Sequence, residues 1–403
     1  MKWLGRKWLG TWFLVGGLLW AVTVVTEGFL APARWEPMGR LAYRTAYLVR
    51  LPVISILDPV FRIPGHHRRL PAVFQFLTAF GAPLFWAGGV WGCGVMVRRW
   101  DEWRRRPGAT PSRDEGRRRF LRFSGGAGVL GVGLTSYATL VEPQRTQVRR
   151  FTAPIRNLPP SLEGLRIVQV SDTHYGPFIS LEYLRSVIRQ ANALAADLIV
   201  LTGDYVHRTP AAIRPGVGVL KELQARLGVV GVLGNHDHWE GAQAVRDAFA
   251  QAGIPLLDNR RRLLNRDSLR SEADAGEVIG ICGVGDLWED QVRFDQALGG
   301  LPDSVPRILL AHNPDTAERI PGEFRVDLML SGHTHGGQIC FPGYGAPVVP
   351  SAYGQRYAGG WCAGPRCPVI VSRGVGMAIL PVRFGVPPEI GEITLTRAAD
   401  LPG

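Results

Sequence analysis

The apolar residues of this chain follow two patterns, one in its first 145 residues and another after residue 163. In the first part they form long uncharged runs at 8–26 and 70–97, followed by a shorter, glycine-rich run at 124–141. A helix needs about 20 apolar residues to cross the core of a bilayer. The first two runs therefore predict transmembrane helices, and the third run predicts a weaker span.

In the second part, short apolar runs of strand length alternate with helical segments. The runs "LRIVQVSD" and "DLIVLTGD" each end in an aspartate, and the segment "SLEYLRSVIRQANALAA" between them predicts a helix. Strand-like runs dominate later, while the polar stretch 260–277 predicts a surface loop. This order predicts an α/β fold. We therefore divide the chain into an N-terminal transmembrane helical region (1–145), a linker (146–163) and a globular domain (164–403).

The charge of the chain belongs to its first part. Residues 1–69 hold ten basic and three acidic residues, and 98–122 hold ten arginines and four acids, whereas 26 basic and 27 acidic residues follow. A pI near 10.0 would ordinarily suggest nucleic-acid binding. Basic residues beside apolar spans instead indicate cytoplasmic loops that contact anionic lipids. We expect the lipid bilayer as a partner and no nucleic acid.

These basic segments predict a topology. With the N-terminus and the loop 98–122 in the cytoplasm, the third run carries the globular domain outward. We expect a multi-pass protein of the inner, cytoplasmic membrane with its domain on the periplasmic or extracellular side. The loop ends in "GRRRFLRFSGGAGVLGVGL", where Arg117 and Arg118 resemble a twin-arginine export signal, with the twin-arginine translocation machinery as partner. A plain stop-transfer segment is the alternative, and both export the domain.

Polar side chains follow five successive predicted strands. The blocks "SDTH", "TGD", "GNHD", "LLAHNPD" and "SGHTH" supply Asp172, His174, Asp204, Asn235, His236, His312, His333 and His335. Functional groups of α/β proteins gather at the carboxyl ends of strands, so we expect these side chains to meet. The glycines in "GNHD" and "SGHTH" suggest backbone pressed close to a bound group. Carboxylate, amide and imidazole donors without cysteine suit Mn²⁺, Fe²⁺ or Zn²⁺.

These blocks, in this order, resemble the calcineurin-like metallophosphoesterases, in particular their membrane-linked bacterial branch. The resemblance covers roughly residues 165–395 and implies a four-layer α/β/β/α sandwich for the domain 164–403. It also implies two divalent metal ions, bridged by Asp204. One ion would be held by Asp172, His174 and His335, and the other by Asn235, His312 and His333. Alternation along an extended segment would point His333 and His335 toward different ions.

The resemblance implies hydrolysis of a phosphoester or pyrophosphate by in-line attack of a hydroxide held between the metals. We expect His236 to act as the general acid that protonates the leaving alkoxide, with Asp237 orienting its imidazole. An exported, membrane-anchored domain suggests a lipid or other envelope substrate. Hydrolysis of UDP-diacylglucosamine in lipid A synthesis is an alternative, although its cytoplasmic site conflicts with the outward topology. A receptor or scaffold with a metal-stabilised fold is the non-enzymatic alternative.

Overall fold

The structure, a computed structural model, describes residues 130, 133–270 and 277–398. The chain forms two compact units, Met1–Thr135 and Ser136–Gly403, and nearly all described residues belong to the second unit. The predicted spans 8–26 and 70–97 and the basic loop with its paired arginines lie outside the described residues. Among the residues that are described, no helix is both long and apolar enough to cross a membrane.

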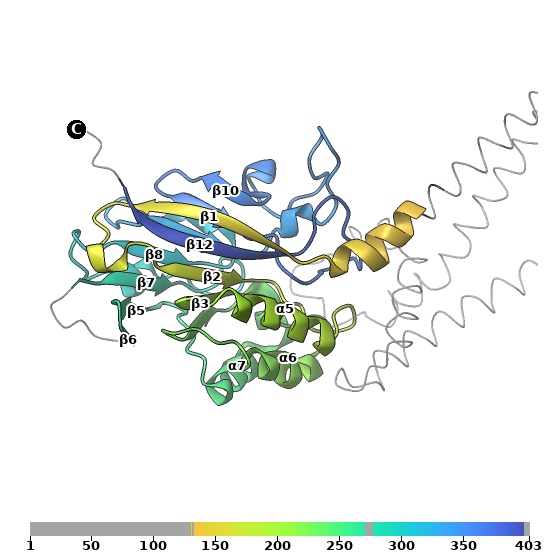
Figure 1. The fold of residues 1–403 in the computed structure, drawn as a ribbon, viewed down its shortest axis with the longest axis horizontal. Helices are drawn as coiled ribbons and strands as arrows, with labels where there is room; N and C mark the ends of the chain where they lie inside the picture. Colours follow the sequence, from red (N-terminus) through yellow and green to blue (C-terminus); the bar gives the residue numbers. More distant parts are fainter. Residues whose placement is uncertain (1–129, 131–132, 271–276, 399–403) are drawn as a thin grey trace, which may run out of the picture. The chain divides into compact units, whose positions relative to one another are not determined.

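Two β-sheets form the centre of the second unit (Figure 1). The first has the strand order β1-β12-β2-β3-β4, with the bounds Gln147–Ile155, Glu389–Arg397, Arg166–Val170, Leu198–Thr202 and Val229–Val232. The second has the order β10-β11-β9-β8-β7-β5-β6, with the bounds Gly360–Ala363, Pro368–Val371, Leu328–Ser331, Arg307–Leu310, Ile279–Gly283, Arg260–Leu264 and Leu269–Arg270. Strands β2–β4 are mutually parallel, as are β7, β8, β9 and β11.

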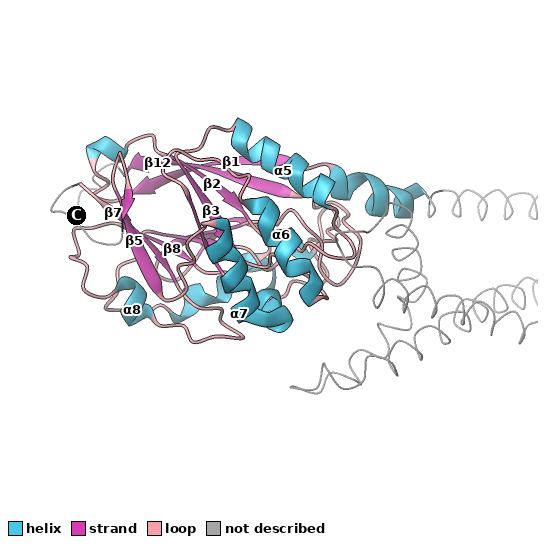
Figure 2. Cartoon of the chain, turned by 90° about the horizontal axis from the view of Figure 1, so that it is seen from below, coloured by secondary structure: helices cyan, strands magenta, loops and turns pink. Residues whose placement is uncertain are grey.

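The apolar faces of the two sheets form one continuous core. Ile167 and Val200 of the first sheet share a fully buried cluster with Ile308 and Leu330 of the second. Outside the first sheet lie the helices α5 (Leu181–Ala193), α6 (Ile213–Leu220) and α7 (Asn235–Ala252), which Figure 2 shows side by side. A second buried cluster on the outer face of the other sheet includes residues of α8 (Phe294–Leu298). The predicted α/β class is confirmed.

Local signals in the sequence account for the helix ends. The Ser180 side chain accepts a hydrogen bond from the Tyr183 amide at 3.0 Å and caps α5. Helix α7 ends at Gly253, whose φ of 72° is the left-handed cap conformation expected for glycine. Cys362 lies on β10 and Cys367 in the turn before β11, and both are free thiols.

The segment 146–163, expected to be a linker, belongs to the folded unit. Strand β1 pairs in parallel with β12 over nine residues, from Gln147 opposite Glu389 to Ile155 opposite Arg397. The arginines of β1 interrupt the apolar pattern that would predict a strand. In the fold they form ion pairs with glutamates of the neighbouring strand. Arg150 Nε lies 2.8 Å from a carboxylate oxygen of Glu392. The folded unit therefore begins before residue 164.

The third apolar run, 124–141, lies only partly within the described residues, so its expected span stays a prediction. Part of the third apolar run, Tyr137–Val141, forms a short π-helix within the second compact unit, and Arg383 N donates to Ala138 O at 2.9 Å. The polar stretch after residue 260 contains the antiparallel strands β5 and β6 rather than a loop. Leu263 and Leu264 supply the apolar contacts that hold this hairpin in the inter-sheet core.

Candidate metal centre

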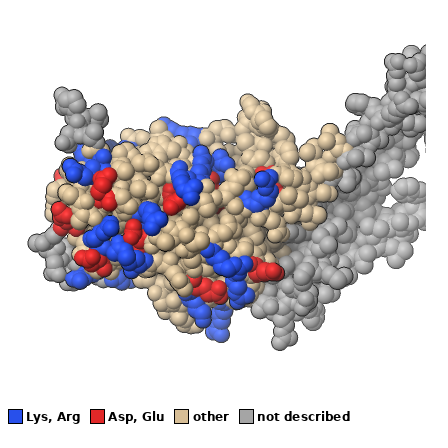
Figure 3. Space-filling model, in the orientation of Figure 1, with Lys and Arg blue, Asp and Glu red and all other residues tan. Residues whose placement is uncertain are grey.

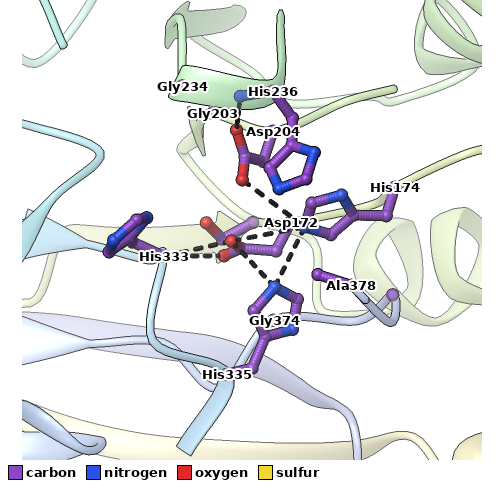
Figure 4. Close-up of polar contacts among 12 residues, drawn as sticks. Asp172, His174, Gly203, Asp204, Gly234, His236, His333, His335, Gly374 and Ala378 are labelled. Carbon is purple, nitrogen blue, oxygen red and sulfur yellow. Dashed lines mark hydrogen bonds and ion pairs between the residues drawn. The ribbon is translucent and has the colours of Figure 1, made fainter. Parts of the chain in front are cut away.

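The predicted site residues meet where parallel strands of both sheets end. Asp172 and His174 follow β2, Asp204 follows β3, and Asn235 begins α7 directly after β4. The remaining histidines come from the other sheet, with His312 after β8 and both His333 and His335 after β9. All of these side chains are buried, and Figure 4 shows Asp172, His174, Asp204 and His335 pointing toward one another. Two sheets packed face to face thus bring together donors that lie up to 163 positions apart.

Three groups of donor atoms lie within 4.8 Å of one another; two of them consist of predicted ligands and are called the two clusters below, and the third joins His174 to His207 and His236. In the first, His335 Nε2 lies 2.9 Å from His174 Nε2 and 3.4 Å from Asp172 Oδ1. The second consists of Asp204, His312 and His333, and His333 Nδ1 lies 3.2 Å from His312 Nε2. Asn235 Oδ1 joins the second cluster at 3.2 Å from His312 Nε2. This division matches the one that the family resemblance implies.

Asp204 lies between the two clusters. Its Oδ2 is 3.5 Å from His174 Nε2 in the first cluster and 3.2 Å from His312 Nε2 in the second. The other oxygen, Oδ1, accepts a hydrogen bond from the His236 amide at 2.8 Å. One carboxylate oxygen therefore faces both clusters, as a bridging ligand must, while the other oxygen is held by the start of α7.

The reason expected for the separation of His333 and His335 is wrong. The chain between them is a turn rather than an extended segment, with φ of 70° at His333 and 53° at His335. Asp172, His174 and Asp204 also have positive φ, between 43° and 57°. Left-handed backbone costs a non-glycine residue about 1–3 kcal/mol and tends to gather at functional sites. Here it directs five donors inward from short loops.

The glycines of the motifs make room for ligand side chains rather than for a bound group. A Cβ on Gly234 would lie 2.3 Å from Asp204 Oδ1, and one on Gly332 would lie 2.2 Å from Asp172 Oδ2. Both distances are shorter than any van der Waals contact permits. The glycines of "GNHD" and "SGHTH" thus allow the neighbouring strand end to place its carboxylate.

Burial and mutual charge set the protonation of the donors. Burial raises the pKa of Asp172 to about 7, with a further contribution from Asp204. Burial alone would lower the pKa of His312, but the Asp204 carboxylate outweighs it and raises that pKa to about 10. Burial holds the pKa values of His174 and His335 well below the usual range, so both are neutral. Their facing nitrogens at 2.9 Å and the sulfur-free donors fit a divalent cation.

Asp237 does not orient the His236 imidazole, contrary to the prediction. Its carboxylate accepts hydrogen bonds from the backbone amides of Asp204, Tyr205 and Gly234, at 2.8–2.9 Å. These bonds tie the turn after β3 to the start of α7. Asp237 therefore fixes the backbone that carries Asp204.

The imidazole of His236 is oriented by His207, which the sequence motifs did not identify. The two Nδ1 atoms lie 3.2 Å apart, and Arg208 Nε donates to His207 Nε2 at 3.1 Å. Because His207 Nε2 accepts a hydrogen bond from Arg208, the proton of the neutral His207 ring is on Nδ1. This N–H donates a hydrogen bond to His236 Nδ1. His236 then carries its own proton on Nε2. The position of His207, three residues after Asp204, was the available signal.

Arg383 is a second residue that the motifs missed. It is fully buried, and its guanidinium donates to the carbonyl oxygens of Gly374 at 3.0 Å and Gly376 at 2.6 Å. The same nitrogen lies 3.4 Å from His335 Nδ1. Arg383 thereby braces the loop after β11 against the first donor cluster, and it lies 48 positions from His335 with no motif around it.

Comparisons with known proteins agree with this geometry. The profile of the calcineurin-like phosphoesterase family matches residues 165–337. The chain is 36% identical over 286 residues to the uncharacterized metallophosphoesterase YkuE of Bacillus subtilis, an alignment that covers 69% of this chain and 97% of YkuE. It is 31% identical over 234 residues to the phosphodiesterase YaeI of Escherichia coli, covering 57% of this chain and 82% of YaeI.

A third relative has a more specific name. The chain is 28% identical over 251 residues to the UDP-2,3-diacylglucosamine pyrophosphatase LpxG of Chlamydia trachomatis, covering 51% of this chain and 74% of LpxG. The family uses divalent metal ions, and the two donor clusters are where this chain can hold them. The chain therefore belongs to the calcineurin-like phosphoesterase family and is a metal-dependent phosphoric ester hydrolase.

Proposed function

We propose that this protein hydrolyses a phosphodiester or pyrophosphate of an envelope lipid at a dinuclear metal centre. The observation that supports the dinuclear centre is the position of Asp204, whose Oδ2 faces both donor clusters. Asp172, His174 and His335 would hold one cation, Asn235, His312 and His333 the other, and Asp204 would bridge them. Two such cations would supply a hydroxide nucleophile from bound water and would neutralise charge on the phosphate oxygens for in-line displacement.

In this proposal His236 is the general acid. Its ring is held by His207, which leaves the proton on Nε2. Its centroid lies 4.7 Å from that of the ligand His174, so a phosphate at the metal centre would lie beside it. Burial lowers the pKa of His236, so the free ring is neutral, and the negative charge of a bound phosphate would favour the protonated form that a general acid needs.

An exposed apolar end of the domain supports the bilayer as partner. Tyr344 and Val348 in the loop 341–349 are each 73% exposed, and Ile379 is 52% exposed. Cys340 N donates to Phe384 O at 2.7 Å, which places the loops carrying these residues side by side. The loop 341–349 projects upward in Figure 1 and is a knob without charged atoms in Figure 3. Such a surface suits contact with lipid.

Two locations remain as alternative proposals, and each fits a different substrate. An outward-facing domain would act on an envelope phosphoester. A cytoplasmic domain would fit hydrolysis of UDP-diacylglucosamine in lipid A synthesis, which the similarity to LpxG supports. Protease digestion of intact cells and of inverted membrane vesicles distinguishes them. Cleavage of the domain in intact cells supports the outward topology, and protection there with cleavage in inverted vesicles supports the cytoplasmic one.

The proposed activity is tested with bis-p-nitrophenyl phosphate. The full chain, purified in detergent and loaded with Mn²⁺, should release p-nitrophenol, and EDTA should abolish the release until Mn²⁺ is restored. A protein that is stabilised by Mn²⁺, Fe²⁺ and Zn²⁺ but turns over no phosphodiester with any of them would be the metal-stabilised receptor or scaffold instead.

A further inference from the structure

Two tryptophans border the metal centre. Trp239 lies on α7 and is 42% exposed, and Trp288 lies in the loop after β7 and is 50% exposed. The ring centroid of Trp239 is 4.4 Å from that of His236, and the Trp288 centroid is 4.4 Å from that of His333. One indole therefore contacts the proposed general acid, and the other contacts a proposed metal ligand.

The two indoles are held in place by one short turn. Trp239 Nε1 donates to Glu289 Oε1 at 2.7 Å. The backbone amides of Trp288 and Glu289 both donate to Asp286 Oδ1, at 2.9 and 3.0 Å, and Asp286 is buried. Because Glu289 follows Trp288 directly, the turn that orients one indole also anchors the other. A partner that binds between them meets rings that are already ordered.

Packing alone does not account for this pair. Indoles that serve only to fill a core are mostly buried, whereas both of these keep about half of their surface in solvent beside a catalytic centre. Trp361, on β10, is 44% exposed as well, yet it has no ring contact with a site histidine among the described residues. Trp239 and Trp288 differ from Trp361 because their rings contact His236 and His333, which would face the substrate phosphate in the proposed function.

We propose that Trp239 and Trp288 form a subsite for a planar aromatic ring, such as a nucleobase, carried by one ester group of the substrate. This inference rests on the proposed function, since it places the phosphate of that substrate at the metal centre. Indole faces stack on any planar π-system, and an aromatic contact to a base typically strengthens binding by about tenfold or more. The substrate class is then a phosphodiester or pyrophosphate that bears a nucleoside.

The test compares two ligands that differ only in the base. Uridine 5′-phosphonate and ribose 5-phosphonate, whose phosphorus–carbon bonds resist hydrolysis, are titrated into the Mn²⁺-loaded full chain by calorimetry. The proposal expects the uridine compound to bind about tenfold or more tightly than the ribose compound. Equal affinities would overturn it. Binding needs no turnover, so the result is independent of whether bis-p-nitrophenyl phosphate is hydrolysed.

Variants locate the effect. Trp239→Leu and Trp288→Leu should each reduce the uridine preference severalfold while changing the affinity for ribose 5-phosphonate less than about twofold, because stacking acts only on the base. Trp239→Phe, which keeps a ring, should retain part of the preference. Trp361→Leu is the matched control and should behave as the unaltered protein. A preference that persists in both Leu variants, or that is equally lost in Trp361→Leu, would refute the subsite.

Discussion

At the scale of single residues, the function of the site depends on which atoms are held and by which partners. His236 has its ring oriented by His207 through the paired Nδ1 atoms at 3.2 Å, and its amide is bound to Asp204 at 2.8 Å. His236 is not one of the seven proposed ligands, and its ring lies beside one of them, His174, at 4.7 Å between ring centroids, where a general acid can reach a leaving group. Asp237, by contrast, contacts only backbone amides among the described residues.

This difference predicts the effect of His236→Ala. Metal content should be retained, because the seven proposed ligand side chains are untouched, while turnover of a dialkyl phosphodiester should fall by about 10²–10⁴-fold. The deficit should be much smaller for bis-p-nitrophenyl phosphate, whose leaving group needs no proton. Steady-state kinetics with both substrates and metal analysis of the same preparation give the answer. Equal deficits on both substrates would argue against a general acid.

Asp237→Asn should act on stability and metal retention rather than on proton transfer. The amide offers one acceptor oxygen where the carboxylate serves three backbone donors, so at least one buried N–H loses its partner at a cost of about 1–3 kcal/mol. Thermal unfolding of the metal-free variant should occur at lower temperature, and the ratio of its kcat values on good and poor leaving groups should stay unchanged. A changed ratio would show that Asp237 does assist His236 in proton transfer.

Metal affinity should rise with pH. Burial disfavours charge on His312, but Asp204 raises its pKa to about 10, and burial raises the pKa of Asp172 to about 7. Both groups hold a proton below those values, and a metal ion must displace it. Mn²⁺ affinity should therefore increase about tenfold per pH unit from 7 to 8 and more steeply from 6 to 7. Calorimetric titration of the metal-free protein measures this, and a flat profile would contradict the protonation states described above.

At the scale of elements, the site depends on how closely the turns after neighbouring strands approach one another. Between the turns after β3 and β4, no side chain separates the two backbones, because a glycine lies there. Gly234 ends the turn after β4 against the Asp204 backbone, where an added Cβ would lie 2.7 Å from Asp204 N. The parallel register of β3 and β4 fixes this approach, since Thr202 lies opposite Val232. The turns at the strand ends cannot separate without breaking the sheet.

Gly234→Ala should therefore disable the centre. The methyl group would displace the Asp204 carboxylate, and we expect loss of bound metal and at least a hundredfold loss of activity with bis-p-nitrophenyl phosphate. Gly218, on α6, is the matched control, because its added Cβ meets nothing within 4 Å. Gly218→Ala should be neutral or stabilise by about 0.5–1 kcal/mol. Full metal content in Gly234→Ala would show that the turn adapts.

At the scale of the whole molecule, the folded unit depends on a strand that lies before the family signature. β1 covers the edge of β12, and β12 pairs antiparallel with β2, the strand after which Asp172 and His174 follow. Arg150 and Glu392 join the two strands across their exposed side. An uncovered edge strand is a site of aggregation.

A chain that starts at residue 164 should consequently misfold. It leaves β12 without its nine-residue partner, and we expect aggregation, whereas a chain that starts at residue 136 should be monodisperse with a cooperative thermal transition. Size-exclusion chromatography and circular dichroism of the two chains compare them directly. A well-folded, monomeric 164–403 chain would show that β1 is dispensable.

The sequence by itself determined the α/β class, the strands β2, β3, β4, β8 and β9, and the donors that follow them, because these depend on local periodicity and on residue types at strand ends. The family resemblance also indicated how the donors divide between two clusters. The predicted extended segment between His333 and His335 did not. Only the tertiary structure decided the His207–His236 contact, the brace of Arg383 and the tryptophan pair.

Those features join residues that are 29 to 50 positions apart and lie in no recurring motif. The same holds for β1, whose arginines conceal a strand until Glu389 and Glu392 of the distant β12 are placed beside them. Local pattern records which face of an element is apolar and which residues end it. Which side chains contact each other depends on packing between elements that are remote in the chain. These contacts are therefore defined only when the two sheets have packed face to face.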